Sequence, residues 1–187
     1  MPGHSTPSQT VGPFFSIGLE HMNRADLAKG SAGERVTIQG CVFDGDGQPV
    51  PDAILEIWQA DADGCYHHPE HDGPKCANSF LGFGRTPTGE QGRFSFTTIK
   101  PGPVYDPEGR PHAPHLQLSI FMRGLLKRLV TRVYFPDEPL NASDPVLQLV
   151  PESRHTTLIA RPLVSKGDIL EWNVCLQGEN ETVFFDC

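Results

Sequence analysis

The sequence has no long hydrophobic run and no recognisable targeting segment. A membrane-spanning helix needs about 18 or more consecutive apolar residues, and no such stretch occurs. Residues 1–5 carry neither a basic lead nor an apolar stretch of signal-peptide length. We therefore expect no membrane partner and a cytoplasmic location. No internal repeat is visible, and 187 residues suffice for one principal core.

Positive charge is also scarce. The chain has 15 Lys and Arg against 23 Asp and Glu, which gives a formal net charge of -8. Nucleic acids and anionic membranes select clustered basic side chains, so this balance argues against a nucleic-acid partner. The basic cluster at residues 123–132 is interrupted by aliphatic residues and is compatible with a strand end and turn, or with a groove for a small anion.

Cysteines are few, odd in number and without Cys-x-x-Cys spacing. This pattern fits neither a secreted disulfide framework nor a zinc ribbon. We expect ordinary free thiols at all five positions, which are Cys41, Cys65, Cys76, Cys175 and Cys187.

What the sequence does contain is a series of short alternating segments. Apolar and polar residues alternate with period two, and each segment ends in Gly, Pro, Asn or Asp. The 18 prolines and 19 glycines fall mostly between the segments, where turns are needed. The pattern predicts an all-β antiparallel β-sandwich with one minor helix over 151–159. Strands are expected at 93–99, 115–121, 132–135, 169–176 and 182–185.

A hairpin is predicted near the start of the sandwich. Residues 36–43 alternate, and the Asp-Gly-Asp-Gly segment at 44–47 supplies residues that tolerate a tight reversal. The return strand is expected over 53–58.

The first 35 residues show no sustained period. Residues 13–19 carry too much apolar surface for a free tail, so an arm docked on another surface is expected. We therefore divide the chain into an arm (1–35) that packs on a partner and a sandwich (36–187).

Two segments contain candidate metal ligands. Residues 66–72, with Cys76 beyond them, include three histidines, but their spacing matches no zinc pattern and Pro69 opposes a helix that would align them. A polar exposed loop is the favoured interpretation. The second segment is residues 110–117, where His115 and Gln117 share one face of the predicted strand.

Residues 51–66 resemble the intradiol ring-cleaving dioxygenase family, and further blocks extend the resemblance from residue 6 to residue 187. Within that family the chain resembles the iron-free alpha chains, which pair with a homologous iron-bearing beta chain. The supporting blocks are residues 6–14, 83–86, 113–115, 121–124, 131–135 and 178–186.

The resemblance also implies which metal ligands are missing. Iron-bearing members hold Fe(III) with two histidines and two tyrosines, and only His115 matches cleanly here. Gln117 replaces the second histidine, Val104 stands at one tyrosine position with Tyr105 one place late, and no tyrosine lies between Tyr66 and Phe80. We therefore expect no metal ligand and no catalytic residue in this chain, with Fe(III) held by the partner beta subunit.

The same resemblance implies that the arm lines the partner's substrate pocket. The matching arm residues are Thr10, Gly12, Pro13 and Phe14, of which Phe14 departs from a tyrosine often found there, and Arg123 matches an arginine near the pocket mouth. The implied reaction uses O₂ to cleave a small aromatic carboxylate, protocatechuate, to 3-carboxy-cis,cis-muconate. A guanidinium at the mouth would attract the carboxylate, by steering or by contact.

Three alternatives remain open at this point. A loop misplaced by one residue would let Tyr105, His112 and His115 form an incomplete metal site. A self-contained Fe(III) dioxygenase with misassigned ligands is the second alternative. A non-enzymatic β-sandwich binding module is the third.

Overall fold

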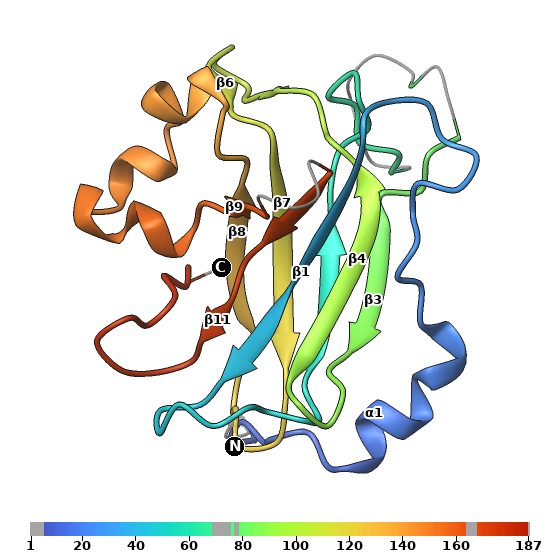
Figure 1. Ribbon diagram of the computed structural model, residues 1–187, viewed down its shortest axis with the longest axis vertical. Helices are drawn as coiled ribbons and strands as arrows, with labels where there is room; N and C mark the ends of the chain where they lie inside the picture. The colour runs from blue at the N-terminus through green and yellow to red at the C-terminus, as the bar shows by residue number, and fades with distance from the viewer. Residues whose placement is uncertain (1–5, 69–75, 77–78, 164–167, 187) are drawn as a thin grey trace, which may run out of the picture.

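The computed structural model describes residues 6–68, 76, 79–163 and 168–186, which form two facing sheets (Figure 1). The first sheet contains β1 (Arg35–Phe43), β4 (Arg93–Ile99), β9 (Arg161–Pro162), β10 (Ile169–Glu171) and β11 (Val174–Cys175). The second contains β2 (Ile54–Trp58), β3 (Phe83–Pro87), β7 (His115–Phe121) and β8 (Leu129–Tyr134). A separate pair joins β5 (Val104–Tyr105) to β6 (Pro111–His112). The predicted sandwich class is confirmed, with β1 additionally pairing in parallel with β10 and β11.

The core lies between the two sheets, and the period-two pattern explains why. On β7, Leu116, Leu118 and Ile120 are buried and point inward, while Gln117 and Ser119 on the opposite face are half-buried. Burial of each such aliphatic side chain contributes about 1.5–3 kcal/mol. Strand β7 is therefore anchored by one face, which leaves the other face available for polar side chains.

The predicted hairpin between residues 36–43 and 53–58 is wrong in its pairing. Strand β1 pairs with β4, whereas β2 pairs with β3 and β7 in the other sheet. The reversal itself is present, because Asp44 N donates to Gln48 O and Gly47 has a φ of 73°. Pro49 and Pro51 lack N–H donors, so the ladder stops after Val50 and the chain crosses to the second sheet.

Short helices are more numerous than predicted. Within the predicted span 151–159, a 3₁₀ helix η4 (Glu152–Thr157) is found. The expectation of a single helix is wrong, because α1 (Phe14–Gly18), η1 (Glu20–Met22), η2 (Pro139–Ser143) and η3 (Leu147–Leu149) also form. Helix α1 has only 5 residues, which is too short to show a helical apolar period in the sequence.

Two predicted strands are shorter or absent. The segment 169–176 is split into β10 and β11. At the break, Cys41 N on β1 donates to the side-chain oxygen of Asn173 at 2.9 Å. Segment 182–185 forms only an isolated bridge between Phe185 and Val130 instead of a strand.

The segment that follows α1 and η1 covers the edges of both sheets. Arg24 bridges to Arg85 on β3, and Asp26 bridges to Thr97 on β4. Leu27 between them is 1% exposed and belongs to the core. Residues 24–28 therefore protect two edge strands from unwanted pairing. In the described part of the chain, no helix combines the length and the apolar character that a membrane span requires.

Candidate functional site

The predicted site residues lie on or near the two ends of strand β7. His115 begins the strand and Phe121 ends it, and the N-terminal arm lies near the Phe121 end in Figure 1. We call the surroundings of His115 the histidine end and the surroundings of residues 121–124 the arm end. Six residues of extended chain separate them by about 20 Å.

At the histidine end, His115 is buried and neutral. Its Nδ1 lies 2.7 Å from Ala113 O. Burial and, to a smaller extent, the nearby charge of Arg132 lower the pKa of His115 to about 4. As predicted, His115 and Gln117 share the outer face of β7, and Gln117 lies opposite Arg132 in the β7–β8 register.

Arg132 brings a permanent positive charge into this group of residues. Its Nη1 lies 3.4 Å from His112 Nδ1 and 3.5 Å from Tyr134 Oη. Tyr134 donates a hydrogen bond of 2.9 Å to Asp144, a fully buried carboxylate that also accepts from Ala113 N. Burial raises the pKa of Tyr134, so its hydroxyl stays protonated and donates. These groups form a satisfied polar network.

Neither Tyr105, which the sequence offered as a ligand one place late, nor Tyr66 completes a ligand set. Tyr105 lies on β5 with 64% of its surface exposed, next to Pro111 rather than against His115. Tyr66 stacks on Trp58 with ring centroids 5.8 Å apart. Burial raises the pKa of Tyr66, which favours the protonated phenol over the phenolate.

The histidine end does not fit Fe(III). His115 offers an imidazole, but its strand neighbour on that face is the amide of Gln117, and Arg132 opposes a cation electrostatically. His112, whose ring centroid lies 6.3 Å from that of His115, already has Arg132 and Asp144 beside its Nδ1. No step of a reaction is therefore assigned to iron bound by this chain. Sequence reasoning placed His115 correctly and missed Arg132 and Asp144, which lie 17 and 29 residues further along the chain.

At the arm end, the structure brings Thr10 beside the turn that carries Arg123. Thr10 Oγ1 accepts a hydrogen bond of 2.7 Å from Gly124 N. The ring of Phe15 packs on Phe121 at a centroid distance of 5.7 Å. A mainly apolar groove of about 210 Å³ lies between the arm and the turn. Gln9 and Val11 line it on the arm side, and the other lining residues are Phe121, Met122, Leu125, Leu126, Lys127 and Arg128. The arm is thus docked on the sandwich.

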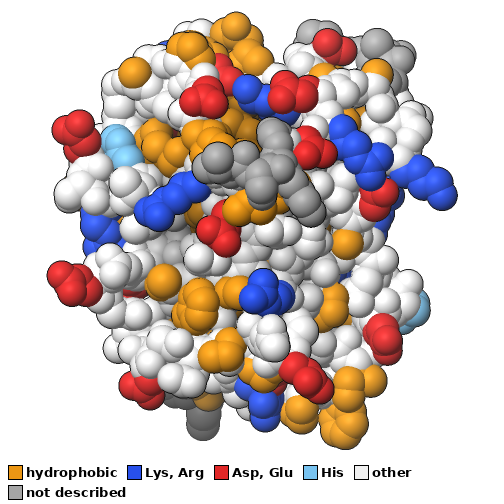
Figure 2. Space-filling model, viewed as in Figure 1, with side chains coloured by type: hydrophobic (Ala, Val, Ile, Leu, Met, Phe, Trp, Pro, Cys, Tyr) orange, Lys and Arg blue, Asp and Glu red, His pale blue; other side chains and the backbone are white. Residues whose placement is uncertain are grey.

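The remaining predicted pocket residues lie next to this contact. Gly12 accepts a hydrogen bond from Phe15 N, and Pro13 is the N-cap residue of α1. Phe14 is the first residue of α1 and is 78% exposed. Hydrophobic side chains protrude at the lower right edge of Figure 2, where Figure 1 places α1.

Arg123 is not a free cation. Its Nε donates to Asp52 Oδ2, and 58% of its side chain is exposed. A solvent-exposed ion pair of this kind is weakly held, so the guanidinium is able to exchange Asp52 for another carboxylate.

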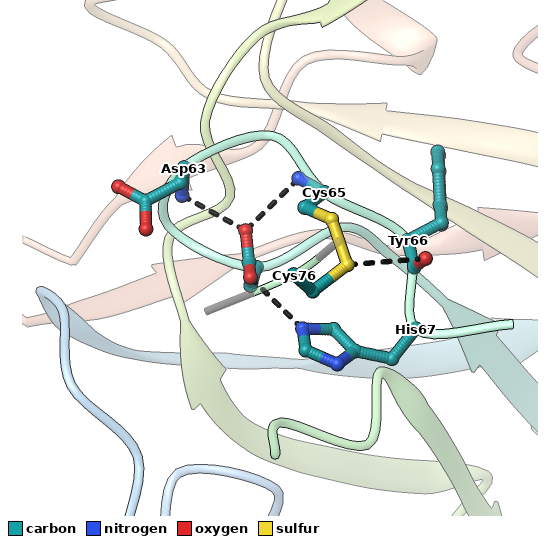
Figure 3. The surroundings of a disulfide bond; sticks show 6 residues. Asp63, Cys65, Tyr66, His67 and Cys76 are labelled. Atoms are coloured by element: carbon teal, nitrogen blue, oxygen red, sulfur yellow. Dashed lines mark hydrogen bonds and ion pairs between the residues drawn. A yellow bond between two sulfur atoms is a disulfide. The ribbon is translucent and has the colours of Figure 1, made fainter. Parts of the chain in front are cut away.

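A third group of chemically active side chains lies in the loop after β2. For part of this loop the sequence favoured a polar exposed loop over a metal site, but His67 and Cys76 are half-buried. The prediction of five free thiols is wrong, because Cys65 and Cys76 form a disulfide. Cys41 and Cys175 are free, and Cys187 lies outside the described residues. Asp61 Oδ1 accepts hydrogen bonds from Asp63 N and Cys65 N, which bends the loop back so that its two sulfurs meet (Figure 3).

The amino-acid sequence is similar to a known protein family over most of its length. A family model described as "Dioxygenase" matches residues 11–178. The chain is 43% identical to the protocatechuate 3,4-dioxygenase alpha chain of Pseudomonas putida, over 97% of this chain and 96% of that relative. It is 41% identical to the protocatechuate 3,4-dioxygenase beta chain of Burkholderia cepacia, over 80% of this chain and 67% of the relative.

A solved structure shows the same fold. The dioxygenase domain of a dioxygenase and carbohydrate-binding protein fusion from Streptomyces sp. SirexAA-E superposes with a TM-score of 0.63 and 25% identity. The superposition covers 83% of this chain and 88% of that domain.

Proposed function

The chain belongs to the intradiol dioxygenase family, and we propose that it is the iron-free alpha subunit of a protocatechuate 3,4-dioxygenase. The observation that carries the proposal is the nearly complete match to an alpha chain, which spans 96% of that relative against 67% of a beta chain. Members of this family are generally Fe(III)-dependent. The proposal adds that the iron belongs to a homologous beta subunit.

The chemistry of the histidine end supports this division of labour. A neutral His115, an amide at Gln117 and a guanidinium at Arg132 are an unsuitable set for a hard trivalent cation. The satisfied network through Tyr134 and Asp144 gives these residues a structural role instead.

The position of the arm supports a shared pocket. The arm end lies about 20 Å along β7 from His115, so this arm is too far away to wall a site at its own histidine end. Phe14 and Ile17 are 78% and 65% exposed, and apolar side chains so placed are covered when a second subunit packs against them. Thr10, Gly12, Pro13 and Phe14 then line the substrate pocket of the beta subunit.

In the proposed reaction, both atoms of O₂ enter protocatechuate, and the ring opens between its two hydroxyl carbons to give 3-carboxy-cis,cis-muconate. This chain contributes the wall that excludes water and fixes the ring orientation. Arg123 attracts the substrate carboxylate at the pocket mouth. The carboxylate then replaces Asp52 as the ion-pair partner of Arg123. The cytoplasmic location expected from the sequence is part of the proposal.

Co-expression with a homologous beta chain tests this assignment. We expect a hetero-oligomer that consumes O₂ with protocatechuate faster than with catechol, and iron that stays with the beta chain when the two are separated. This chain expressed alone is expected to be colourless and inactive. A lone chain with visible ferric-tyrosinate absorption and O₂ uptake would establish the self-contained enzyme instead.

A further inference from the structure

The loop after β2 contains four potential ligands for a metal ion. In the described part of the chain, Asp61, Cys65, His67 and Cys76 are the one group of three or more His, Cys, Asp or Glu side chains whose ligand atoms all lie within 4.8 Å of one another. All four are buried or half-buried. Figure 3 shows His67 and the disulfide beside the same carboxylate, with dashed lines for the hydrogen bonds.

We propose that this cluster is a redox-gated site for a zinc-class divalent cation. In the oxidised state, Cys65 and Cys76 are joined and no cation binds. In the reduced state, their thiolates, the imidazole of His67 and the carboxylate of Asp61 form a closed four-ligand site.

The donor set matches what zinc selects. Two thiolates, one imidazole and one carboxylate suit a tetrahedral structural zinc site. Zinc–ligand bonds of about 2.0–2.3 Å place ligand atoms about 3.3–3.8 Å apart, so atoms already within 4.8 Å need only small movements. The sulfurs separate and His67 Nε2, now 2.9 Å from Asp61 Oδ2, shifts towards the cation.

Hydrogen bonds already hold the loop in a conformation that brings the four ligands together. Asp61 is fully buried, its Oδ1 accepts hydrogen bonds from Asp63 N and Cys65 N, and its Oδ2 lies 2.9 Å from His67 Nε2. Gly102 N donates to Asp61 O at 2.8 Å, which fixes the loop against the segment that leads to β5. Pre-positioned ligands of this kind lower the ordering cost of metal binding.

The sequence did not predict this site, because the spacing of its ligands matches no zinc-ribbon pattern. The intervals are Asp61-x₃-Cys65-x-His67-x₈-Cys76, and the first ligand comes three residues after the end of β2. The other histidines of the loop play different parts. His68 packs edge-on against Trp58 at 6.2 Å, and His71 lies outside the described residues.

A small-molecule thiol is the reductant that opens the disulfide. Two thiol molecules give up two electrons and two protons to the Cys65–Cys76 bond, which yields two cysteine thiols and one disulfide of the reductant. Binding of the dication then releases the two thiol protons, because thiolates are the metal ligands. An oxidant of the disulfide class reverses both steps and expels the cation.

Binding would fix the part of the loop that carries Tyr66. Tyr66 lies between the ligands Cys65 and His67, and its ring stacks on Trp58, which lies opposite Gln117 in the β2–β7 register. Either the disulfide or the cation therefore links the two sides of this loop, so the fold keeps a cross-link in oxidising and in reducing surroundings.

Cobalt and zinc binding to the full chain test the proposal. The chain is reduced with a phosphine, freed of metal, and titrated with Co²⁺ while thiolate-to-cobalt charge-transfer absorption is recorded. We expect one equivalent of Co²⁺ in tetrahedral coordination, displaced by Zn²⁺, and no binding after oxidation with a diazene dicarboxamide. This comparison uses the unmodified sequence, so it does not depend on the folding of any variant.

Matched variants identify the ligands. The double change Cys65→Ser and Cys76→Ser should abolish the cobalt band, and His67→Gln should weaken Zn²⁺ binding by about tenfold or more. The double change Cys41→Ser and Cys175→Ser removes free thiols elsewhere and should leave binding unaltered. Alkylation followed by peptide mapping should show Zn²⁺ protecting Cys65 and Cys76 in the reduced chain.

Two results would overturn the proposal. One is the absence of a charge-transfer band in the reduced chain at one equivalent of Co²⁺. The other is equal binding by the oxidised chain or by the Cys65→Ser and Cys76→Ser variant, which would place the cation elsewhere.

Discussion

The two ends of β7 belong to the same strand but have different chemistry. At the histidine end, His115, Arg132, Tyr134 and Asp144 satisfy one another in a largely buried network. At the arm end, the contacts are few and exposed, with one hydrogen bond from Gly124 N to Thr10 and one exposed ion pair at Arg123. The histidine end therefore contributes to folding stability, and the arm end presents an exposed surface.

The difference indicates which end of β7 is able to contact another molecule. The polar groups at the histidine end already bind one another, whereas the exposed side chains of Phe14 and Ile17 leave apolar surface uncovered. Catalysis by the complex should therefore respond to changes at the arm end. Changes at the histidine end should appear as changes in folding stability.

The largest effect is expected from deletion of residues 1–15. This removes Thr10, Gly12, Pro13 and Phe14 together, and misplacement of substrate by about 1 Å already costs about 100-fold in rate. We expect kcat/KM of the complex for protocatechuate to fall at least about 100-fold while the iron content stays constant. Steady-state O₂ uptake and iron analysis provide the two measurements. Loss of iron in proportion to activity would contradict the division of roles.

The histidine end should give the next largest effect, in stability rather than activity. The pKa of His115 is about 4 in the folded chain against 6.5 ordinarily, so the unfolded chain binds more protons between these values. The free energy of unfolding is thus fully retained above pH 6.5, falls as the pH drops from 6.5 to about 4, and levels off below that. The loss is on the order of 3 kcal/mol.

Chemical denaturation across this pH range measures the effect. His115→Gln should flatten the dependence, and His21→Gln, which changes an exposed histidine on η1, should not. An equal slope in wild type and His115→Gln would show that another group carries the titration.

A smaller effect is expected at Arg123. Arg123→Gln removes the charge that attracts the substrate carboxylate, and the loss of one exposed charge should raise KM for protocatechuate about threefold, with kcat nearly constant. The difference should shrink in high salt. Arg110→Gln alters another exposed, paired arginine and should leave KM unchanged. A fall in kcat with constant KM would argue against attraction of the carboxylate.

The smallest effect is expected for Thr10→Val. The substitution keeps the shape of the side chain and removes the acceptor for Gly124 N, an exposed bond worth about 1 kcal/mol or less. Protease resistance of the arm in the isolated chain should fall slightly, and Thr10→Ser should restore it. An unchanged rate of cleavage in Thr10→Val would show that Phe15 on Phe121 holds the arm without help from this bond.

Local patterns predicted the elements well where one face is buried. Both β4 and β7 were predicted with their observed bounds, because alternating Phe94 and Phe96, or Leu116 and Leu118, record which side faces the core. Pairing was not predictable in the same way. The Asp44–Gly47 turn looks the same whether the chain returns to its own sheet or crosses to the next, and that choice depends on long-range contacts.

For the candidate site, the sequence indicated individual residues but not their partners. The family blocks located Thr10, Phe14, Arg123 and His115, but their burial and partners depend on distant segments. Asp52 pairs with Arg123 across 71 residues of sequence, and Cys65 joins Cys76 through a turn set by Asp61. No local period records such contacts.

The position of the iron in the assembled complex is the most direct test. Anomalous diffraction at the iron edge, from crystals of this chain with its beta partner, should place one iron in the beta chain on the side of the pocket that Phe14 faces, with no peak at His115. An iron peak coordinated by His115 of this chain would contradict the account.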